Sequence, residues 1–522
     1  MVTWFNDDFQ VAWKDPNDAG LTWLPDFIHL ARPVLPLSEE YIRGVRERFA
    51  GNRCIFVNGY HYMSRSQSVA QIRATQVSDP RGARQIWQET CLPIVEKLCF
   101  DLRSRPYTVM TVEEMAAAAP EYIREAAEVS ITTHLASSAF MSIGRNLVEL
   151  CENELGVDGV NFAVAVLQGA GNDSRDSGLA LARLAEEASR HPELAAAISD
   201  GLYGEIGKAD GGSDFLGRLQ EYLNKFGWRG ESWFMIHLPT WAEQPSLALD
   251  QVARHIRAGT RLLESHHVAR EARLAAEQEL MRRVSVERSS SLESSLMEVD
   301  DFSFVSEARA HWQLIGAGSV RVPLLELGRK LVAKGVITEV EDVFWLYLSE
   351  VEALAGQIVP MKNEVQFRKT EHARWQSLDP PAFLGTPNRE PTTASDALRI
   401  ELIMGPAKIG AGPDATGSIK GRAASPGIVK GRARVVTTLE EASKLESGDI
   451  LVTRSTSPTW TSLFATVAGV VSDSGGILSH TAICAREFGV PCVVGTQNGT
   501  LRIRDGDLIV LDGSAGTVTV LI

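Results

Sequence analysis

The sequence has few cysteines, and they are not grouped. Its 522 residues include six, which are Cys54, Cys91, Cys99, Cys151, Cys484 and Cys492. These positions show neither the paired spacing of a structural zinc site nor the density of a disulfide framework. We therefore expect reduced, mostly buried thiols, no metal site and a cytoplasmic location.

The sequence also lacks a long apolar run and an excess of positive charge. No segment approaches the ~20 consecutive apolar residues needed to span a bilayer, and the first residues are neither basic nor apolar. Lys and Arg number 52 against 66 Asp and Glu, which gives a net charge of -14. Because this balance disfavours general attraction to polyanions, we expect a soluble globular protein that binds neither nucleic acid nor membrane.

A long helical region occupies most of the chain. From about residue 38 to 390, Ala, Leu, Glu and Arg recur at three- and four-residue spacing, as in 179–187 and 252–284, which is typical of helices. Clusters of Gly, Asp, Pro or Ser at 169–176, 201–212, 239–245 and 289–295 predict breaks between helices. The strongest β signal before residue 400 is a hairpin around Asn58-Gly59.

The composition changes towards the C-terminus. Residues 404–416 are rich in Gly, Pro and Ala and predict a flexible linker. Beyond it, β-type runs at 429–436, 450–453, 469–472, 492–495, 508–511 and 517–521 surround one helix that starts near Ser479. The fold class is thus α plus α/β, with a mainly helical domain at 1–403 and a small domain at 417–522.

The segment 470–491 carries the clearest chemical signal. A buried strand leads into Gly475-Gly476, Ser479 is suited to cap a helix, and Gly489 ends that helix. His480 is then in the first helical turn, where unpaired backbone N–H groups and the helix dipole favour an anion such as phosphate.

A neutral imidazole, with a pKa near 6.5, is a good nucleophile at cellular pH. Placed beside an anion site, His480 is suited to carry a covalent phosphoryl group. The alternative is that His480 only caps or packs against the helix, and spacing alone leaves both interpretations open.

The motif 475–491 resembles the signature of the mobile phosphohistidine domain of phosphoenolpyruvate-utilising enzymes. Flanking residues at 424–427, 448–453, 457–460 and 505–507 agree, so the resemblance covers 417–522. It implies a swivelling β/β/α domain in which His480 takes up phosphate from an ATP-binding domain and delivers it elsewhere. We expect the phosphate to be bound around His480 by Gly475, Gly476, Ser479, Thr481, Thr453 and Arg486, although Thr453 and Arg486 could equally be structural.

The helical region resembles other members of this group. Segments 324–332 and 335–346 are similar to the substrate domain of rifampin phosphotransferase and of phenylphosphate synthase-like enzymes. The resemblance implies transfer of phosphate to a hydroxyl, with ATP converted to AMP and Pi. Our first hypothesis is a phenol or cresol acceptor; the alternatives are an antibiotic hydroxyl of the rifampin type or a non-catalytic phosphocarrier.

Two features of such enzymes are not found in the sequence. There is no barrel after the phosphohistidine domain, and no glycine-rich pattern suited to nucleotide phosphates. We therefore expect ATP and Mg²⁺ to be bound by a separate ATP-grasp subunit, while this chain carries the covalent phosphohistidine.

Transfer to a hydroxyl needs a base and cations near the moving phosphoryl group. Candidates in the helical region are His134, Arg229, His61 and His237. Arg229 follows Gly227-Trp228 where relatives often show Gly-His-Arg, so the departure at Trp228 leaves its role open. For each candidate, an ordinary packing role is the alternative.

Overall fold

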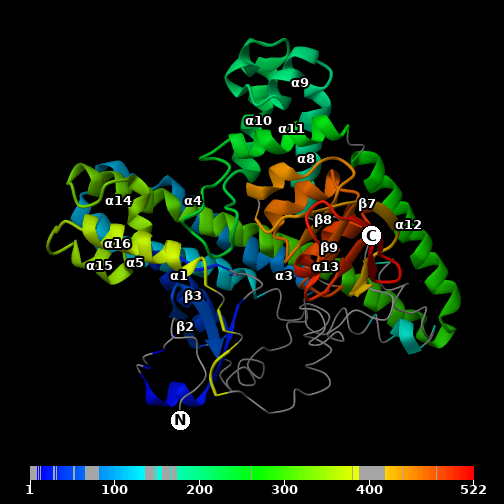
Figure 1. Ribbon diagram of the computed structural model, residues 1–522, viewed down its shortest axis with the longest axis horizontal. Coiled ribbons are helices and arrows are strands. Elements are labelled where there is room, and N and C mark those ends of the chain that lie inside the picture. The colour runs from blue at the N-terminus through cyan, green and yellow to red at the C-terminus, as the bar shows by residue number, and fades with distance from the viewer. Residues whose placement is uncertain are drawn as a thin grey trace.

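The computed structural model places a large helical part beside a small C-terminal α/β domain (Figure 1). The structure describes residues 9–521 except 10, 12, 14, 27–29, 31, 51–52, 65–81, 136–146, 148–149, 154, 156–165, 167–172, 260–261, 379, 382, 387–417, 439 and 478. The expected linker at 404–416 lies outside the described residues.

The region before residue 380 is mainly helical, as the sequence predicts. Its α-helices are α1 (Pro36–Ala50), α3 (Ala83–Ile86), α4 (Leu92–Ser104), α5 (Val112–Thr133), α8 (Asp173–Ala188), α9 (Pro192–Ser199), α10 (Gly212–Phe226), α11 (Ser246–Ala258), α12 (Leu262–Arg283), α13 (Ser289–Ser319), α14 (Arg321–Ala333), α15 (Leu348–Ala353) and α16 (Lys362–Trp375). Shorter turns are η2 (Pro16–Gly20), η3 (Trp87–Cys91, a π-helix), η4 (Tyr107–Val109), η5 (Tyr203–Lys208), η6 (Val286–Arg288) and η7 (Val340–Trp345).

Helix α5 is central to the largest core. It begins with a capping box, in which Thr111 Oγ1 accepts from the Glu114 backbone N–H at 3.1 Å and the Glu114 carboxylate accepts from Thr111 N–H at 2.8 Å. Its apolar face packs against α1, α4, α13 and α14. Because α5 is buried on several sides, the surrounding helices pack on it.

Of the four predicted helix breaks, two are confirmed. The break predicted at 169–176 is only partly covered, because residues 169–172 lie outside the described residues and residues 173–176 begin α8. Residues 201–212 contain η5 between α9 and α10, and residues 239–245 separate α10 from α11. The predicted break at 289–295 is wrong, because these residues form the first turns of α13. Leu292 is fully buried there, so core packing outweighs the weak helix preference of the neighbouring serines.

A four-stranded sheet lies near the N-terminus, in the order β2-β3-β1-β4. The strands are β1 (Thr22–Pro25), β2 (Arg53–Val57), β3 (Tyr60–Ser64) and β4 (Leu384–Gly385). The predicted hairpin is confirmed, with Asn58 and Gly59 at φ 52° and 71°. Strands β1 and β4 were not predicted; Trp23 pairs with Leu384 across more than 350 residues of sequence, which no local pattern indicates.

The C-terminal domain contains an eight-stranded sheet in the order β5-β12-β11-β7-β8-β9-β10-β6. The strands are β5 (Ile419–Lys420), β6 (Arg422–Ser425), β7 (Ile428–Val435), β8 (Ile450–Thr453), β9 (Gly469–Ser472), β10 (Cys492–Val494), β11 (Leu508–Asp512) and β12 (Thr517–Leu521), and the helical segments are η8 (Glu440–Lys444), η9 (Pro458–Ala465), α18 (His480–Glu487) and α19 (Gly499–Arg502). All six predicted strands are confirmed, whereas β5, β6 and α19 were not predicted.

Parallel pairing sets the position of α18. Strands β7, β8, β9 and β10 are parallel neighbours, so their carboxyl ends meet at one edge of the sheet. The chain leaves β9 at that edge and enters α18. Ligand sites in such sheets lie beyond the carboxyl ends of the strands, which is where His480 is found.

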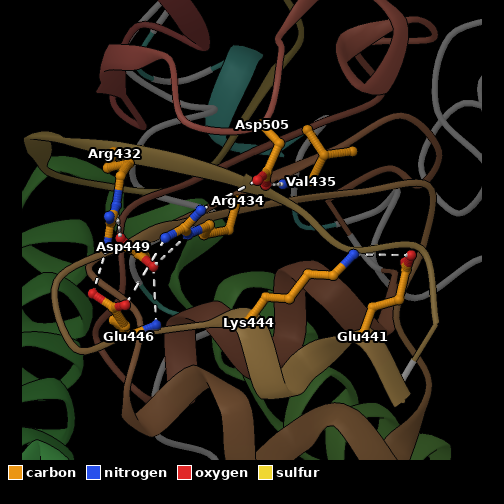
Figure 2. Close-up of polar contacts among 8 residues, drawn as sticks. All are labelled: Arg432, Arg434, Val435, Glu441, Lys444, Glu446, Asp449 and Asp505. Carbon is orange, nitrogen blue, oxygen red and sulfur yellow. Dashed lines mark hydrogen bonds and ion pairs between the residues drawn. The ribbon is translucent and has the colours of Figure 1, made fainter.

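The opposite edge of the sheet is fixed by Asp449 (Figure 2). Its buried carboxylate accepts from Arg432 Nε at 3.0 Å, from Arg434 Nε at 3.1 Å and from the Glu446 backbone N–H at 2.9 Å. Arg434 also donates to Asp505 at 3.2 Å. This network holds the start of β8 against β7.

The small domain contacts the helical part in two regions. The ring of Phe488 lies against Gly178 of α8, and Ser462 donates to Gln251 at 2.8 Å. On the other side, Ile477 and Ile483 share an apolar cluster with helical residues that include Leu280, Leu292 and Ala308. The domain is thereby held with the start of α18 facing α13.

Among the helices of the described ranges, none has both the length and the apolar character that crossing a bilayer requires.

We expect Asp449→Asn to reduce the free energy of unfolding by about 1–3 kcal/mol, because it weakens buried hydrogen bonds to a charged group. Denaturant unfolding of the chain measures this change. The matched control is Lys444→Gln in the same view, whose exposed side chain pairs with Glu441 at 3.4 Å and should be worth less than about 1 kcal/mol. Equal losses in the two variants would contradict the role given to Asp449.

Candidate active site

The turn before α18 requires glycine at one position. Gly475 has φ +99°, and a Cβ there would lie 2.7 Å from Ser479 Oγ. Ser479 has extended backbone angles, and its Oγ accepts from the Ala482 backbone N–H at 3.4 Å. The predicted cap is thus confirmed, and His480 is the first residue of α18.

The His480 ring faces a carboxylate of the helical part. Its Nδ1 lies 3.3 Å and 3.2 Å from the two carboxylate oxygens of Glu307 on α13. Both side chains are largely buried, with 9% and 2% exposed. Burial lowers the pKa of His480, but the neighbouring Cys484 sulfur and Glu307 carboxylate together outweigh it and hold the pKa well above its ordinary value. Glu307 therefore favours a proton on Nδ1.

Cys484 lies on the same face of α18 as His480, one turn later. Its Sγ is 3.4 Å from Nε2 and 3.7 Å from Nδ1 of His480, and Thr461 Oγ1 lies 3.7 Å from the sulfur. Burial raises the pKa of the Cys484 thiol. The ring nitrogens of His480 are therefore flanked by a carboxylate and by a thiol.

The ligand atoms of Glu307, His480 and Cys484 all lie within 4.8 Å of one another. We expected no metal site from the sequence because its cysteines are not paired. The spacing His-x-x-x-Cys at 480–484 was a usable signal, since residues four apart share a helix face. Nothing in the sequence pointed to Glu307, which is 173 residues away.

The residues predicted to bind phosphate gather around the same turn. The Gly476 carbonyl accepts from Ser479 N–H at 3.0 Å, and Thr481 Oγ1 lies 2.9 Å from Thr456 Oγ1. Thr453, fully buried at the end of β8, donates to the Ser455 carbonyl at 3.3 Å. Their phosphate contacts stay a prediction.

Arg486 is placed differently from these residues. It is fully buried, and its Nη1 donates to the Ala424 carbonyl of β6 at 2.9 Å. Burial lowers its pKa to about 10. This contact ties α18 to β6 and favours the structural alternative for Arg486.

His134 belongs to a polar network between the end of α5 and α13. Its Nδ1 lies 2.6 Å from the Ser130 carbonyl and its Nε2 lies 3.3 Å from Arg309 Nη1. Gln313 Nε2 is 3.1 Å from His134 Nδ1. Because a carbonyl only accepts, Nδ1 carries the proton and Nε2 is an acceptor. Burial lowers the pKa of Arg309 to about 10, while Glu307 counteracts that effect.

His61 lies in a neighbouring network. Its Nε2 is 3.3 Å from Cys54 Sγ, and its Nδ1 is 4.0 Å from Asp26. Asp26 pairs with Arg46 at 2.5 Å, and the Arg46 guanidinium lies 4.6 Å from the centre of the Phe234 ring. Arg46 and Arg309 influence each other electrostatically, so the two networks are close.

The other two candidates lie in different surroundings. His237 Nδ1 is 3.4 Å from Ser38 Oγ, and burial lowers the pKa of His237 to about 3. Arg229 donates to Tyr222 at 2.9 Å and stacks 4.6 Å from the Trp241 ring centre. These contacts support packing roles, whereas His134, at the C-terminal cap of α5, contacts Arg309 and Gln313 of α13, the helix that carries Glu307.

Comparison with known proteins identifies two regions of the chain. Residues 445–516 match the family model of the PEP-utilising enzyme mobile domain, and residues 131–298 match the rifampicin phosphotransferase fourth domain. The first match includes His480 and Cys484. The second includes His134, Arg229 and His237.

Three relatives illustrate the range of similar proteins. An uncharacterised phosphotransferase of Bacillus subtilis is 32% identical over 68% of this chain and 43% of its own length. The rifampicin phosphotransferase of the same organism is 30% identical over 67% of this chain and 40% of its own length. Chondramide synthase of Chondromyces crocatus is 29% identical over 98% of this chain and 14% of its own length.

The chain therefore spans less than half of the length of each of these relatives. The family expected from the sequence motif is confirmed by the matches on both parts of the chain. Residues 445–516 are thus a mobile domain of the PEP-utilising enzyme type, and residues 131–298 are related to the fourth domain of rifampicin phosphotransferases.

Proposed function

We propose that the chain is the phosphocarrier and acceptor-binding part of an ATP-dependent phosphotransferase, in which His480 carries the phosphoryl group to a hydroxyl. The observation that carries this proposal is the contact of His480 Nδ1 with Glu307 of the helical part. This contact places the His480 ring, which lies in the first turn of α18, against the part of the chain that we expect to bind the acceptor.

The contact has a direct chemical consequence for transfer. With Nδ1 engaged by Glu307, the phosphoryl group is carried on Nε2. During transfer the acceptor oxygen forms a bond to phosphorus, the P–Nε2 bond breaks, and its electron pair returns to the ring. A proton held on Nδ1 by Glu307 lets the ring leave as neutral imidazole rather than as an anion.

The acceptor hydroxyl must lose its proton in the same step. His134 Nε2 is suited to take it, because its Nδ1 proton is committed to the Ser130 carbonyl at 2.6 Å. Arg309, 3.3 Å from His134 and influenced by Glu307, supplies positive charge for the moving phosphoryl group. Both residues belong to the helical part, as an acceptor site requires.

The relatives bear on the class of acceptor. They include rifampicin phosphotransferases, whose name fits the antibiotic alternative better than the phenol or cresol that was our first hypothesis. We therefore propose a hydroxyl of a large, antibiotic-like compound as the acceptor. Phenols remain the comparison class in the test.

The phosphoryl donor completes the proposal. ATP with Mg²⁺ phosphorylates His480 on an ATP-binding partner, which we propose to be a separate polypeptide. The described residues before 380, which are mainly helical, are proposed to bind the acceptor rather than ATP. His480 then reaches Glu307 by a movement of the small domain.

We expect phosphoramidate, a small donor that phosphorylates histidine, to add one phosphoryl group at Nε2 of His480. Intact mass, peptide mapping and phosphorus NMR at alkaline pH identify the residue and the ring nitrogen. His480→Ala should lose the added mass, whereas His191→Ala, at an exposed ring paired with Asp210, should keep it. Stoichiometric label on His480→Ala would refute the carrier role.

Glu307→Gln should leave His480 able to accept phosphate but slow its delivery by about 100-fold, since the proton on Nδ1 is no longer favoured. Single-turnover decay of the phosphorylated chain, with and without the acceptor, measures delivery separately from loading. Glu287→Gln, at an exposed position before α13, is the control. Unchanged delivery in Glu307→Gln would exclude the proposed role of this carboxylate.

The acceptor class is tested by thermal unfolding of the chain with a panel of compounds. Since a ligand that binds the folded state raises the midpoint, we expect a rifamycin-type macrocycle to raise it and simple phenols to leave it unchanged. Arg309→Gln should abolish the shift. A shift with phenol or cresol alone would restore the first hypothesis.

A further inference from the structure

We propose that Glu307, His480 and Cys484 form a zinc site that bridges the small domain and the helical part. His480 and Cys484 come from α18, whereas Glu307 comes from α13, so the three side chains meet only when the two parts are docked. Imidazole, thiolate and carboxylate are the donors that zinc takes in proteins.

The distances suit a tetrahedral ion. Zinc bonds of about 2.0–2.2 Å to nitrogen or oxygen and about 2.3 Å to sulfur place tetrahedral ligand atoms roughly 3.3–3.6 Å apart. Here Nδ1 lies 3.2 Å from a Glu307 oxygen and 3.7 Å from Cys484 Sγ. The remaining edge, from sulfur to carboxylate, is within 4.8 Å, and a small carboxylate movement closes it.

Zinc binding exchanges protons for the ion. Zinc displaces the thiol proton of Cys484 and the Nδ1 proton of the docked, protonated His480, so that two protons leave for each ion bound while Nε2 keeps its own. Thr461 Oγ1, 3.7 Å from the sulfur, is placed to donate to that thiolate, as outer hydrogen bonds do at zinc sites. Three protein ligands leave the fourth position for water or a phosphate oxygen.

The site has a regulatory consequence, which rests on the proposed function. An ion bound to both parts holds the small domain against α13 and keeps the His480 ring from a phosphoryl donor elsewhere. Zinc would therefore inhibit loading of His480 by stabilising the docked arrangement.

The chain contains a second His–Cys pair that serves as a matched control. His61 Nε2 lies 3.3 Å from Cys54 Sγ, as close as the pair on α18. Its carboxylate neighbour, Asp26, is paired with Arg46 at 2.5 Å, and the Asp26–His61 separation of 4.0 Å is long for a zinc edge. Of these two histidine–cysteine contacts within the described residues, the one on α18 has a suitable third ligand.

The test is titration of the reduced full-length chain with Zn²⁺ against a chromophoric chelator, repeated with Co²⁺. We expect one equivalent of zinc, and with cobalt a thiolate charge-transfer band. Cys484→Val and Glu307→Gln should weaken binding by more than the roughly 10–100-fold that loss of an outer hydrogen bond costs. Cys54→Val should bind as the unaltered chain does, and circular dichroism checks the fold of each variant.

Absence of a zinc equivalent in the unaltered chain, or equal binding by folded Cys484→Val, would overturn the site. If Cys484→Val does not fold, Glu307→Gln and the cobalt band decide. Binding is measured without any phosphoryl donor, and phosphorylation of His480 is measured with EDTA present. A failure of the zinc site is therefore distinguishable from a failure of the phosphocarrier role.

Discussion

The contact between His480 and Glu307 is the interaction on which the candidate site depends. A ring with one nitrogen against a carboxylate has a defined proton position, and this defines which nitrogen is the nucleophile. The two residues come from different parts of the chain, so the chemistry of the ring changes with docking. When the domain is undocked, the pKa of His480 loses the influence of Glu307 and the neutral ring is the better nucleophile. When docked, the protonated ring is the better leaving group.

This division suits a carrier that must both accept and release phosphate. A single fixed environment would favour one half of the cycle at the expense of the other. The helix start at Ser479 and the glycine turn at Gly475 move with His480 and keep the anion site the same in both positions. Glu307, which stays on α13, is the part of the environment that changes.

Local sequence patterns predicted the small domain well and the docked site poorly. The cap at Ser479, the glycine turn and six strands depend on neighbours within a few residues, so spacing identifies them. Strands β1 and β4 pair across most of the chain, and Glu307 meets His480 across 173 residues. Contacts between such distant residues depend on tertiary packing, which the periodicity of the sequence does not predict. The serine cluster of α13 shows the same limit, since buried Leu292 outweighs local preference.

The docked interface combines properties that a moving domain needs. Apolar contacts of Ile477 and Ile483 with the helical cluster supply attraction that is largely insensitive to the charge on the ring. The pair of His480 with Glu307 adds an attraction that depends on the charge of the ring. A dianionic phosphoryl group on Nε2 brings negative charge towards Glu307, and Arg309, near Glu307, offsets part of that repulsion. In the proposed cycle, docking is therefore weaker while His480 carries the phosphate, and stronger once the phosphate has left and the protonated ring faces Glu307 alone.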